Sequence, residues 1–491
     1  MAHKYDLILK NGKIIDGSGT DAVRMDLAIK GDQIAALGKF RDEQAKEVID
    51  VTDKIISPGF IDVHTHDDNA VLKSPDCIPK ISQGVTSVIV GNCGLSASPL
   101  NLKKDPPDPL NLLGTQSDFK FATFSDYVKA VNSVQPAVNV AGLIGHTSLR
   151  VNHMSDLFRT ATPYETQAMQ EDLEESMASG AIGLSTGLAY GTAIHSTTQE
   201  VTALAGRVNS YNGVYVTHLR NEFDQVLDAL SEAFEIGETA DLPVIVSHLK
   251  CAGPDNWGRS KEILDFINNS RYSHRINMDC YPYAAGSSTL DLGQVDERVK
   301  ILITWSEKHP EMGKKTLEDI AKIWQVSQLE AAKRLMPAGA VYFSISEDDM
   351  KRVISHPKTM IGSDGLPHDP HPHPRLWGTF PRVIGKLSRE QKLFTIATAV
   401  HKMTGLAAQN FHLKNRGLIK KGYAADVVVF DPDSIADAAT FENPKQYSIG
   451  VERVYVNGVE SYVNGEVKGQ RAGKYIGSQQ SAAQEDLVVN L

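Results

Sequence analysis

Five side chains with metal-binding chemistry recur through the middle of the sequence, each shortly after a short apolar run. They are His64, His66, Cys93, His218 and His248. In the His64-x-His66 pair both imidazoles point to the same side of an extended segment, because strand side chains alternate with a period of two. Imidazole and thiolate ligands together favour Zn²⁺, or another late first-row metal, over Mg²⁺ and Ca²⁺. The set therefore predicts a zinc site.

A carboxylate completes the predicted chemistry. Asp364 follows another apolar run, 359–362. Amide hydrolysis needs a nucleophile, a polarised carbonyl and a proton for the leaving amine, and Zn²⁺ lowers the pKa of a bound water to about 7. Asp364 could take the proton of the water and later deliver it to the nitrogen. We therefore predict that Asp364 is the general acid and base.

The remaining histidines and cysteines are assigned differently. His146 follows the run 138–144, and the sequence leaves a metal ligand and a buried core histidine equally open for it. We interpret Cys77, Cys251 and Cys280 as structural. The prolines within the tract 368–373 favour a loop over a metal-binding tract.

Eight short apolar runs would have to position these residues. They lie at 56–61, 86–90, 138–144, 181–184, 214–217, 243–247, 276–279 and 359–362. The runs hardly alternate, as is typical of buried parallel strands, and most of the intervals are long enough for crossover helices. One helix begins with Thr162-Pro163 and a capping-box Glu165, and it ends at Gly180. The pattern predicts an α/β fold with a (β/α)₈ TIM-type barrel over 58–417, whose chemistry lies beyond the carboxyl ends of its strands.

Two further units are predicted around this barrel. The interval before the eighth run is too long for one helix, so we expect an inserted subdomain over 285–345 with its own helices, including one over 317–335. Both ends of the chain are rich in β-type residues and contain the hairpin signals Asn11-Gly12, Asn457-Gly458 and Asn464-Gly465. We expect one small β-sandwich-like domain from residues 1–57 and 418–480.

Composition excludes several classes of function. The chain of 491 residues has 50 Lys and Arg against 60 Asp and Glu, and the net charge of −10 argues against nucleic acid or an anionic membrane as partner. We find no apolar run near the length of a membrane span and no signal-peptide pattern at the start. Four cysteines in so long a chain favour a reducing compartment, so we expect a cytoplasmic protein. The sequence leaves the oligomeric state open.

The sequence resembles the metal-dependent amidohydrolase superfamily and, within it, the N-acyl-D-amino-acid deacylases (D-aminoacylases). His64-x-His66 with the late Asp364 marks the superfamily, and Cys93 after the second run narrows the match to the deacylases. The resemblance covers nearly the whole chain. It rests on the segments 58–66, 91–94, 216–222, 247–250, 279–283, 362–368 and 373–380.

The resemblance implies roles for individual residues. Cys93, His218 and His248 would hold one tightly bound Zn²⁺, while His64, His66 and Asp364 would form a second, weaker or partly filled site. Many superfamily members bridge two ions with a carboxylated lysine after the fourth strand, but Ser185 and Thr186 stand there, so Cys93 would have to bridge. The implied substrate is a small N-acyl-D-amino acid. Its α-carboxylate would be held by Lys250, Tyr281, Ser287 and Arg375, and Tyr190 would line the pocket.

Residue chemistry partly supports this substrate assignment. Lys250 lies two residues beyond His248 and points to the same side if the strand continues, and the fork of Arg375 suits a carboxylate. The stretch 288–295 contains no Arg or Lys, so we favour substrates with neutral or hydrophobic side chains. N-acyl-D-glutamate or N-acyl-D-aspartate stays an alternative if Arg298 folds into the pocket.

The sequence is less consistent with three other functions. A cyclic-amide hydrolase of the hydantoinase or dihydroorotase type would be expected to carry the bridging lysine. A serine hydrolase is suggested by Gly183-Leu184-Ser185-Thr186-Gly187, but that motif must turn directly into a helix, and a loop-like stretch follows instead. A barrel that serves only as a binding scaffold would have lost ligands, and none is lost.

Overall fold

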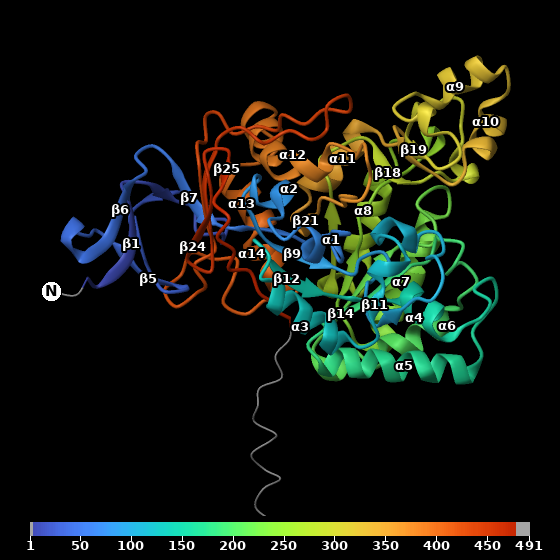
Figure 1. Ribbon diagram of the computed structural model, residues 1–491, viewed down its shortest axis with the longest axis horizontal. Coiled ribbons are helices and arrows are strands. Elements are labelled where there is room, and N and C mark those ends of the chain that lie inside the picture. The colour runs from blue at the N-terminus through green and yellow to red at the C-terminus, as the bar shows by residue number, and fades with distance from the viewer. Residues whose placement is uncertain (1–2, 478–491) are drawn as a thin grey trace, which may run out of the picture.

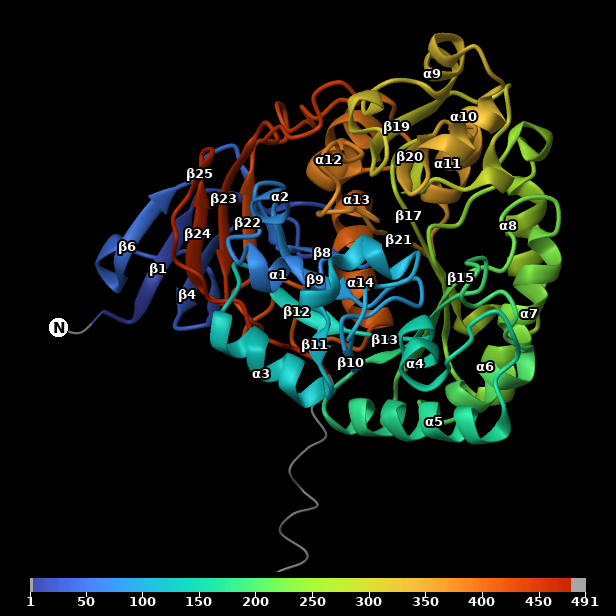
Figure 2. The ribbon, with the colours of Figure 1, turned by 45° about the vertical axis from the view of Figure 1, so that its right-hand side comes forward.

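The computed structural model describes residues 3–477. The chain has β-rich ends and a middle in which strands and helices alternate. Figure 1 shows the blue N-terminal strands beside the red C-terminal strands at one end of the molecule, with the green and yellow middle at the other. Figure 2, turned by 45°, shows the same two-part arrangement.

The middle of the chain contains two parallel sheets. One has the order β12-β9-β8, and the other has the order β13-β14-β15-β16-β17-β21. All neighbouring strands in both sheets pair in parallel. The strands are β8 (Phe60–Asp62), β9 (Val85–Val90), β12 (Asn139–Gly142), β13 (Ile144–Gly145), β14 (Gly183–Gly187), β15 (Val214–His218), β16 (Val244–Val246), β17 (Ile276–Cys280) and β21 (Thr359–Ile361).

Backbone contacts join the ends of these two sheets. Just beyond β8 and β21, the amide of Asp364 donates to the carbonyl of His64 at 2.8 Å, and Thr65 and Gly365 form a parallel bridge. At the other end, β12 and β13 are separated only by Leu143. The carboxyl ends of β8 and β21 therefore lie side by side, which brings the His-x-His pair next to Asp364.

Each predicted apolar run overlaps a strand, and two of the runs overlap two strands each. The run 56–61 contains the end of β7 (Ile55–Pro58) and most of β8, and the run 138–144 spans β12 and the start of β13. These strands are almost entirely buried, which explains why their sequences do not alternate between apolar and polar residues. β7 pairs with strands of the terminal sheet, so the first run links the two parts of the molecule.

Helices follow most of these strands. The predicted helix is α5 (Pro163–Ala178), whose cap is confirmed: Thr162 accepts from the amide of Glu165, and the Glu165 side chain accepts from the amide of Thr162. The other helices are α1 (Ala70–Lys73), α2 (Ile78–Ile81), α3 (Phe124–Val134), α4 (His146–His153), α6 (Thr198–Ala205), α7 (Val226–Ala240), α8 (Ser260–Asn269), α11 (Glu347–Ser355), α12 (Arg375–Arg382), the π-helix η9 (Val383–Glu390), α13 (Ile396–Met403) and α14 (Gly405–Asn410). Within residues 3–477, none of the helices is both long and apolar enough to span a membrane.

The segment predicted as an insertion forms its own small layer. β18 (Gly286–Thr289), β19 (Ile301–Ser306) and β20 (Ala338–Tyr342) make an antiparallel sheet with the order β18-β20-β19. The region expected to be helical holds two helices, α9 (Leu317–Trp324) and α10 (Gln328–Leu335), separated where Gln325 adopts a left-handed conformation. Figures 1 and 2 show α9 and α10 at the periphery of the molecule.

The β-rich end contains two sheets. The four-stranded sheet, with the order β5-β4-β1-β6, is built from N-terminal strands alone, whereas the seven-stranded sheet, with the order β25-β24-β23-β22-β7-β2-β3, combines strands from both ends of the chain. Buried apolar side chains of both sheets, Leu9 and Val429 among them, pack in one cluster. The strands are β1 (Tyr5–Lys10), β2 (Lys13–Ile14), β3 (Val23–Arg24), β4 (Asp26–Lys30), β5 (Gln33–Gly38), β6 (Ala45–Asp50), β22 (Val427–Phe430), β23 (Val451–Val456), β24 (Val459–Val463) and β25 (Glu466–Val467).

The three Asn-Gly signals have different outcomes. Asn457-Gly458 and Asn464-Gly465 join antiparallel neighbours, and all four residues have positive φ, as a type I′ turn requires. The hairpin predicted at Asn11-Gly12 is wrong, because β1 and β2 lie in different sheets. Only Asn11 of that pair has positive φ, so the chain crosses between the sheets instead of folding back. Residues 478–480 of the predicted terminal domain lie outside the described residues.

Candidate metal centre and active site

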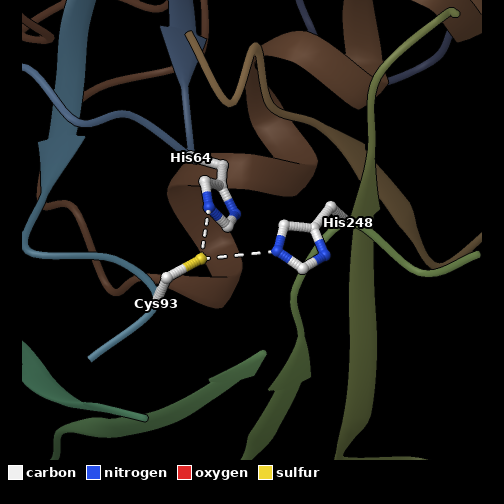
Figure 3. Close-up of side chains that lie close together, drawn as sticks. All are labelled: His64, Cys93 and His248. Carbon is white, nitrogen blue, oxygen red and sulfur yellow. Dashed lines mark hydrogen bonds between the residues drawn. The ribbon is translucent and has the colours of Figure 1, made fainter. Parts of the chain in front are cut away.

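The thiol of Cys93 lies between two imidazoles from other strands. Its Sγ is 3.2 Å from Nε2 of His64 and 3.4 Å from Nε2 of His248. Figure 3 shows the sulfur directed at both rings. Burial alone would raise the thiol pKa, but the charges of His64 and His248 hold the pKa of Cys93 well below its usual range. The residue is therefore suited to be a thiolate ligand.

These donors fit a zinc ion. Zinc–sulfur bonds of about 2.3 Å and zinc–nitrogen bonds of about 2.0 Å in a tetrahedron imply sulfur–nitrogen separations of about 3.5 Å. The two separations at Cys93, 3.2 and 3.4 Å, are close to that value. Thiolate and imidazole are also the ligand types that zinc prefers.

Two further groups of possible ligands adjoin this one. Nε2 of His66 lies 3.1 Å from Oδ1 of Asp364, and His64 completes that group. His218 is grouped with His248 and Glu222. Among the described residues, the ligand atom of Cys93 groups with those of His64 and His248. The resemblance instead implies that Cys93 binds the tight zinc together with His218 and His248. His218 nevertheless also lowers the pKa of the Cys93 thiol.

Three of the predicted functional residues have a left-handed backbone. The φ angles are 55° at Cys93, 33° at His248 and 49° at Asp364. Such conformations cost about 1–3 kcal/mol each in residues other than glycine, and they concentrate at functional sites. Close packing adds a constraint at Gly362, where an added Cβ would lie 2.4 Å from Cβ of His64.

Two carboxylates that the sequence analysis did not single out orient the histidines. Asp279, at the end of β17, accepts from the amide of His248 at 2.9 Å and lies 3.3 Å from Nδ1 of His64. Oε1 of Glu222 lies 3.0 Å from Nδ1 of His248. Carboxylates in these positions fix the orientation of metal-binding imidazoles. Both residues lie within segments of the family resemblance, which was the only signal for them.

Asp364 is paired with the predicted carboxylate-binding Arg375. Nη1 of Arg375 lies 2.8 Å from Oδ2 of Asp364, and both side chains are buried. Burial alone would raise the pKa of Asp364, but Arg375 and the imidazoles of His64 and His66 hold it well below the usual range. Asp364 is therefore ionised in this arrangement and can accept a proton.

A cavity of about 570 Å³ opens onto these residues. Its walls include His66, His218, His248 and Asp364 together with all five predicted substrate-contacting residues: Tyr190, Lys250, Tyr281, Ser287 and Arg375. The hydroxyls of Tyr281 and Ser287 and the Nε of Arg375 are buried without a hydrogen-bond partner among the described residues. Buried polar atoms without partners are costly, so these groups are suited to bind a polar ligand.

Lys250 and Tyr190 have partners of different kinds. Nζ of Lys250 donates to Oε1 of Glu222 at 2.5 Å. The ring of Tyr190 packs on that of His218, with centroids 4.9 Å apart. Lys250 is therefore charge-paired at the cavity wall, while Tyr190 shapes the wall beside a predicted metal ligand.

The cavity wall does not include Arg298, His146 or the three remaining cysteines. Arg298 pairs with Asp255 and Asp296. His146 is buried, and its Nε2 lies 2.9 Å from Glu200. Cys77, Cys251 and Cys280 are free, buried thiols whose pKa values burial raises to about 12, which fits the structural role assigned to them.

The geometry is unfavourable for a serine nucleophile at Ser185. Its hydroxyl donates to the carbonyl of Gly91 and accepts from the amide of Gly94. The chain after β14 continues as turns until α6 begins at Thr198, so no helix follows the motif directly. The hydroxyl is thus engaged by backbone groups instead of by a base.

Comparison with known proteins gives concordant matches. The amidohydrolase family model matches residues 47–315 and 312–462. The chain is 46% identical over 472 residues to a D-aminoacylase of Alcaligenes xylosoxydans xylosoxydans, covering 96% of this chain and 97% of that protein. An N-acyl-D-aspartate deacylase of the same organism is 44% identical, with 96% and 95% covered.

A solved structure matches over the same extent. It is the N-acyl-D-glutamate deacylase of Bordetella bronchiseptica, in complex with zinc and a phosphonate inhibitor that mimics the tetrahedral intermediate of its reaction. The TM-score is 0.93 at 42% identity, and the match covers 96% of this chain and 100% of the other.

Proposed function

This chain belongs to the amidohydrolase family, and we propose that it is a zinc-dependent hydrolase of N-acyl-D-amino acids. The products are a carboxylate and a free D-amino acid. The observation that carries the proposal is the convergence of Cys93, the imidazoles and the Asp364–Arg375 pair on one cavity. The relatives that act on N-acyl-D-amino acids supply the substrate class.

The metal ligands are divided between two positions. Cys93, His218 and His248 would hold the tightly bound zinc, and His64, His66 and Asp364 would form the weaker position. The proximity of Cys93 to both His64 and His248 supports a bridging role for its thiolate. When bound, zinc supplies Lewis acidity, which activates water near neutral pH and polarises the amide carbonyl.

The substrate carboxylate would be held by polar groups on this cavity. The Nε of Arg375 and the hydroxyls of Tyr281 and Ser287 have no hydrogen-bond partner among the described residues. Lys250, which forms an ion pair with Glu222, adds a positive charge to the cavity wall. Tyr190 lines the pocket. These contacts would orient the scissile amide toward Asp364.

Asp364 moves the protons. One of its oxygens takes the proton of the attacking water, and the same carboxyl then delivers it to the amide nitrogen as the bond to the acyl carbon breaks. Arg375 keeps the carboxylate ionised before the reaction. Arg375 contacts both Asp364 and the carbonyl of Ser287, so its guanidinium is held in place at the cavity wall.

Substrates with neutral or hydrophobic side chains are favoured over the acidic alternatives. Apolar side chains on the cavity wall include Leu112, Leu290 and Ile345. Arg298, the cation that would have supported a D-glutamate or D-aspartate preference, is paired with carboxylates away from this wall. A cyclic-amide hydrolase is disfavoured because Ser185 and Thr186 stand where the bridging lysine would be.

The proposal extends to architecture. The parallel strands would close into a (β/α)₈ barrel over residues 58–417, which the contacts between β8 and β21 support. An inserted subdomain over 285–345 and a β-sandwich-like domain from 1–57 and 418–480 complete it. A cytoplasmic location fits the four free cysteines.

The test is a hydrolysis screen of paired N-acetyl-D- and N-acetyl-L-amino acids with zinc added. We expect turnover of D-isomers, loss of turnover with a chelator, and recovery when zinc is returned. Hydrolysis of L-isomers alone would overturn the substrate class, and turnover unaffected by chelator would overturn the metal dependence.

A further inference from the structure

We propose that Asp108 and Asp291 make part of the substrate cavity selective for charge, so that it accepts cationic side chains and disfavours anionic ones. The inference rests on the proposed function and names its substrate class more closely. N-acyl derivatives of D-lysine or D-arginine would be accepted beside neutral substrates, and those of D-aspartate and D-glutamate would be poor substrates.

The two carboxylates come from separate segments and line one cavity. Asp108 lies between β10 (Leu100–Asn101) and the 3₁₀-helix η2 (Leu110–Leu113), in the connection that follows β9. Asp291 lies directly beyond β18, before the 3₁₀-helix η7 (Leu292–Gln294). Both are exposed and share the cavity with the metal-binding histidines. A substrate in the cavity would therefore be exposed to their charge.

No cation among residues 3–477 forms an ion pair with either carboxylate. Asp291 accepts from the amide of Gly293 at 2.9 Å and from the Gln294 side chain at 3.3 Å, and both donors are neutral. Although Asp108 is exposed as a residue, desolvation of its carboxyl by neighbouring groups raises its pKa, while a hydrogen bond with Thr289 lowers it. The negative charge of Asp291 also raises the pKa of Asp108, so the two carboxylates are near enough to interact.

The cations on the same wall are already engaged. Arg220 is held by Glu232 and by the carbonyls of Ile194 and Ser196. Lys250 pairs with Glu222. The third cation, Arg375, is assigned to the α-carboxylate of the substrate. A side-chain carboxylate would thus meet two acidic residues and no free positive charge in the described part of the cavity.

The cavity has the features of a ligand site independently of these acids. Tyr281 is 2% exposed, and its hydroxyl lacks a hydrogen-bond partner among the described residues. The same wall carries Asp364 and three of the histidines near Cys93. The α-carboxylate end of the substrate is therefore fixed, and the charge of its side chain becomes the variable on which Asp108 and Asp291 act.

The experiment compares kcat/KM of the zinc-loaded full-length enzyme for N-acetyl-D-leucine, N-acetyl-D-lysine and N-acetyl-D-glutamate. The variants are Asp108→Asn, Asp291→Asn and the double variant, because asparagine keeps the shape and removes the charge. Asparagine also remains a good helix cap at position 291. Asp105→Asn is the matched control, since Asp105 is an exposed acid of the same loop that does not line the cavity.

We expect the wild type to disfavour the D-glutamate substrate. In the double variant, the ratio of kcat/KM for the D-glutamate substrate to that for the D-leucine substrate should rise at least tenfold. The corresponding ratio for the D-lysine substrate should fall about tenfold. Effects of this size are expected when charges that lie near the substrate are removed. Asp105→Asn should leave both ratios as in the wild type. Added salt should narrow the ratios of the wild type.

The possible results test the proposed function and the charge selection separately. Lack of hydrolysis of every N-acyl-D-amino acid by the zinc-loaded wild type would overturn the proposed function. Hydrolysis of N-acetyl-D-leucine with ratios equal in the wild type and the double variant would overturn only the charge selection. A wild type that prefers N-acetyl-D-glutamate would also overturn it.

Discussion

Nη1 of Arg375 lies 2.8 Å from Oδ2 of Asp364, although the two residues belong to different segments of the cavity wall. The contact links the residue proposed to bind the substrate carboxylate with the residue proposed to move protons. Substrate binding and proton transfer should therefore respond to changes at either position.

Replacement of Arg375 by lysine should impair substrate binding although the positive charge is kept. Lysine lacks the planar fork that binds a carboxylate through two hydrogen bonds, so we expect KM to rise about tenfold or more. Steady-state kinetics with N-acetyl-D-methionine would measure the change. Arg382→Lys, on the same helix but outside the cavity wall, is the control and should keep the wild-type KM. Equal KM values for all three proteins would contradict the assignment.

Replacement of Asp364 by asparagine should remove most of the turnover. The amide cannot take up the proton of the water, so we expect kcat to fall by about 10²–10⁴. Zinc at the Cys93 position should stay bound, because that ion does not depend on Asp364. The measurements are kcat and zinc content by elemental analysis. A variant that retains its turnover would rule out the proton-transfer role.

Replacement of Cys93 by alanine should abolish tight zinc binding. The thiolate is central to the closest ligand group, with imidazoles at 3.2 and 3.4 Å. Zinc content after dialysis against a weak chelator measures the effect. Cys251→Ala removes another buried thiol, outside the ligand groups, and should retain zinc. If Cys93→Ala kept its full zinc content, the proposed centre would be wrong.

Glu222 contacts Lys250 at 2.5 Å as well as His248 at 3.0 Å, and the contact with Lys250 should couple these two residues. We expect Glu222→Gln and Lys250→Met each to reduce kcat/KM, and the double variant to lose less than the product of the two single losses. Residues in contact commonly couple by about 0.5–3 kcal/mol. A double-mutant cycle on kcat/KM measures this coupling. Strictly multiplicative losses would show that the two residues act independently.

Lys402 should give the unfolding stability a dependence on pH. Its side chain is buried, and burial lowers its pKa from 10.5 to about 8. Between pH 8 and 10.5 the unfolded chain binds more protons than the folded chain, so this group makes stability rise with pH by up to about 3 kcal/mol. Lys402→Met should remove that contribution. The measurement is the unfolding midpoint of the wild type and of the variant at pH 7.5 and at pH 9.5. Relative to the variant, the midpoint of the wild type should be higher at pH 9.5 than at pH 7.5. An unchanged difference would contradict the assignment.

Local sequence patterns predicted the strands and helices correctly where interactions between neighbouring residues determine them. The buried parallel strands lack alternation, and the cap of α5 is formed by neighbouring residues, so both were recognisable. The Asn11-Gly12 turn was predicted wrongly because the partners of β1 and β2 are chosen by sheets that include distant strands. The division at Gln325 between α9 and α10 was also not predicted.

Residue types and their order along the chain establish which chemistry is available: imidazoles, a thiol and a carboxylate near the ends of strands, together with cations that suit a carboxylate ligand. Which of these groups come into contact depends on the three-dimensional packing of the chain. The placement of Asp279 and Glu222 against the histidines, the pairing of Arg375 with Asp364 and the exclusion of Arg298 from the cavity wall all depend on contacts between distant segments. The periodicity of the sequence indicates on which face of its strand a side chain lies, whereas the distances between strands depend on how the whole chain packs.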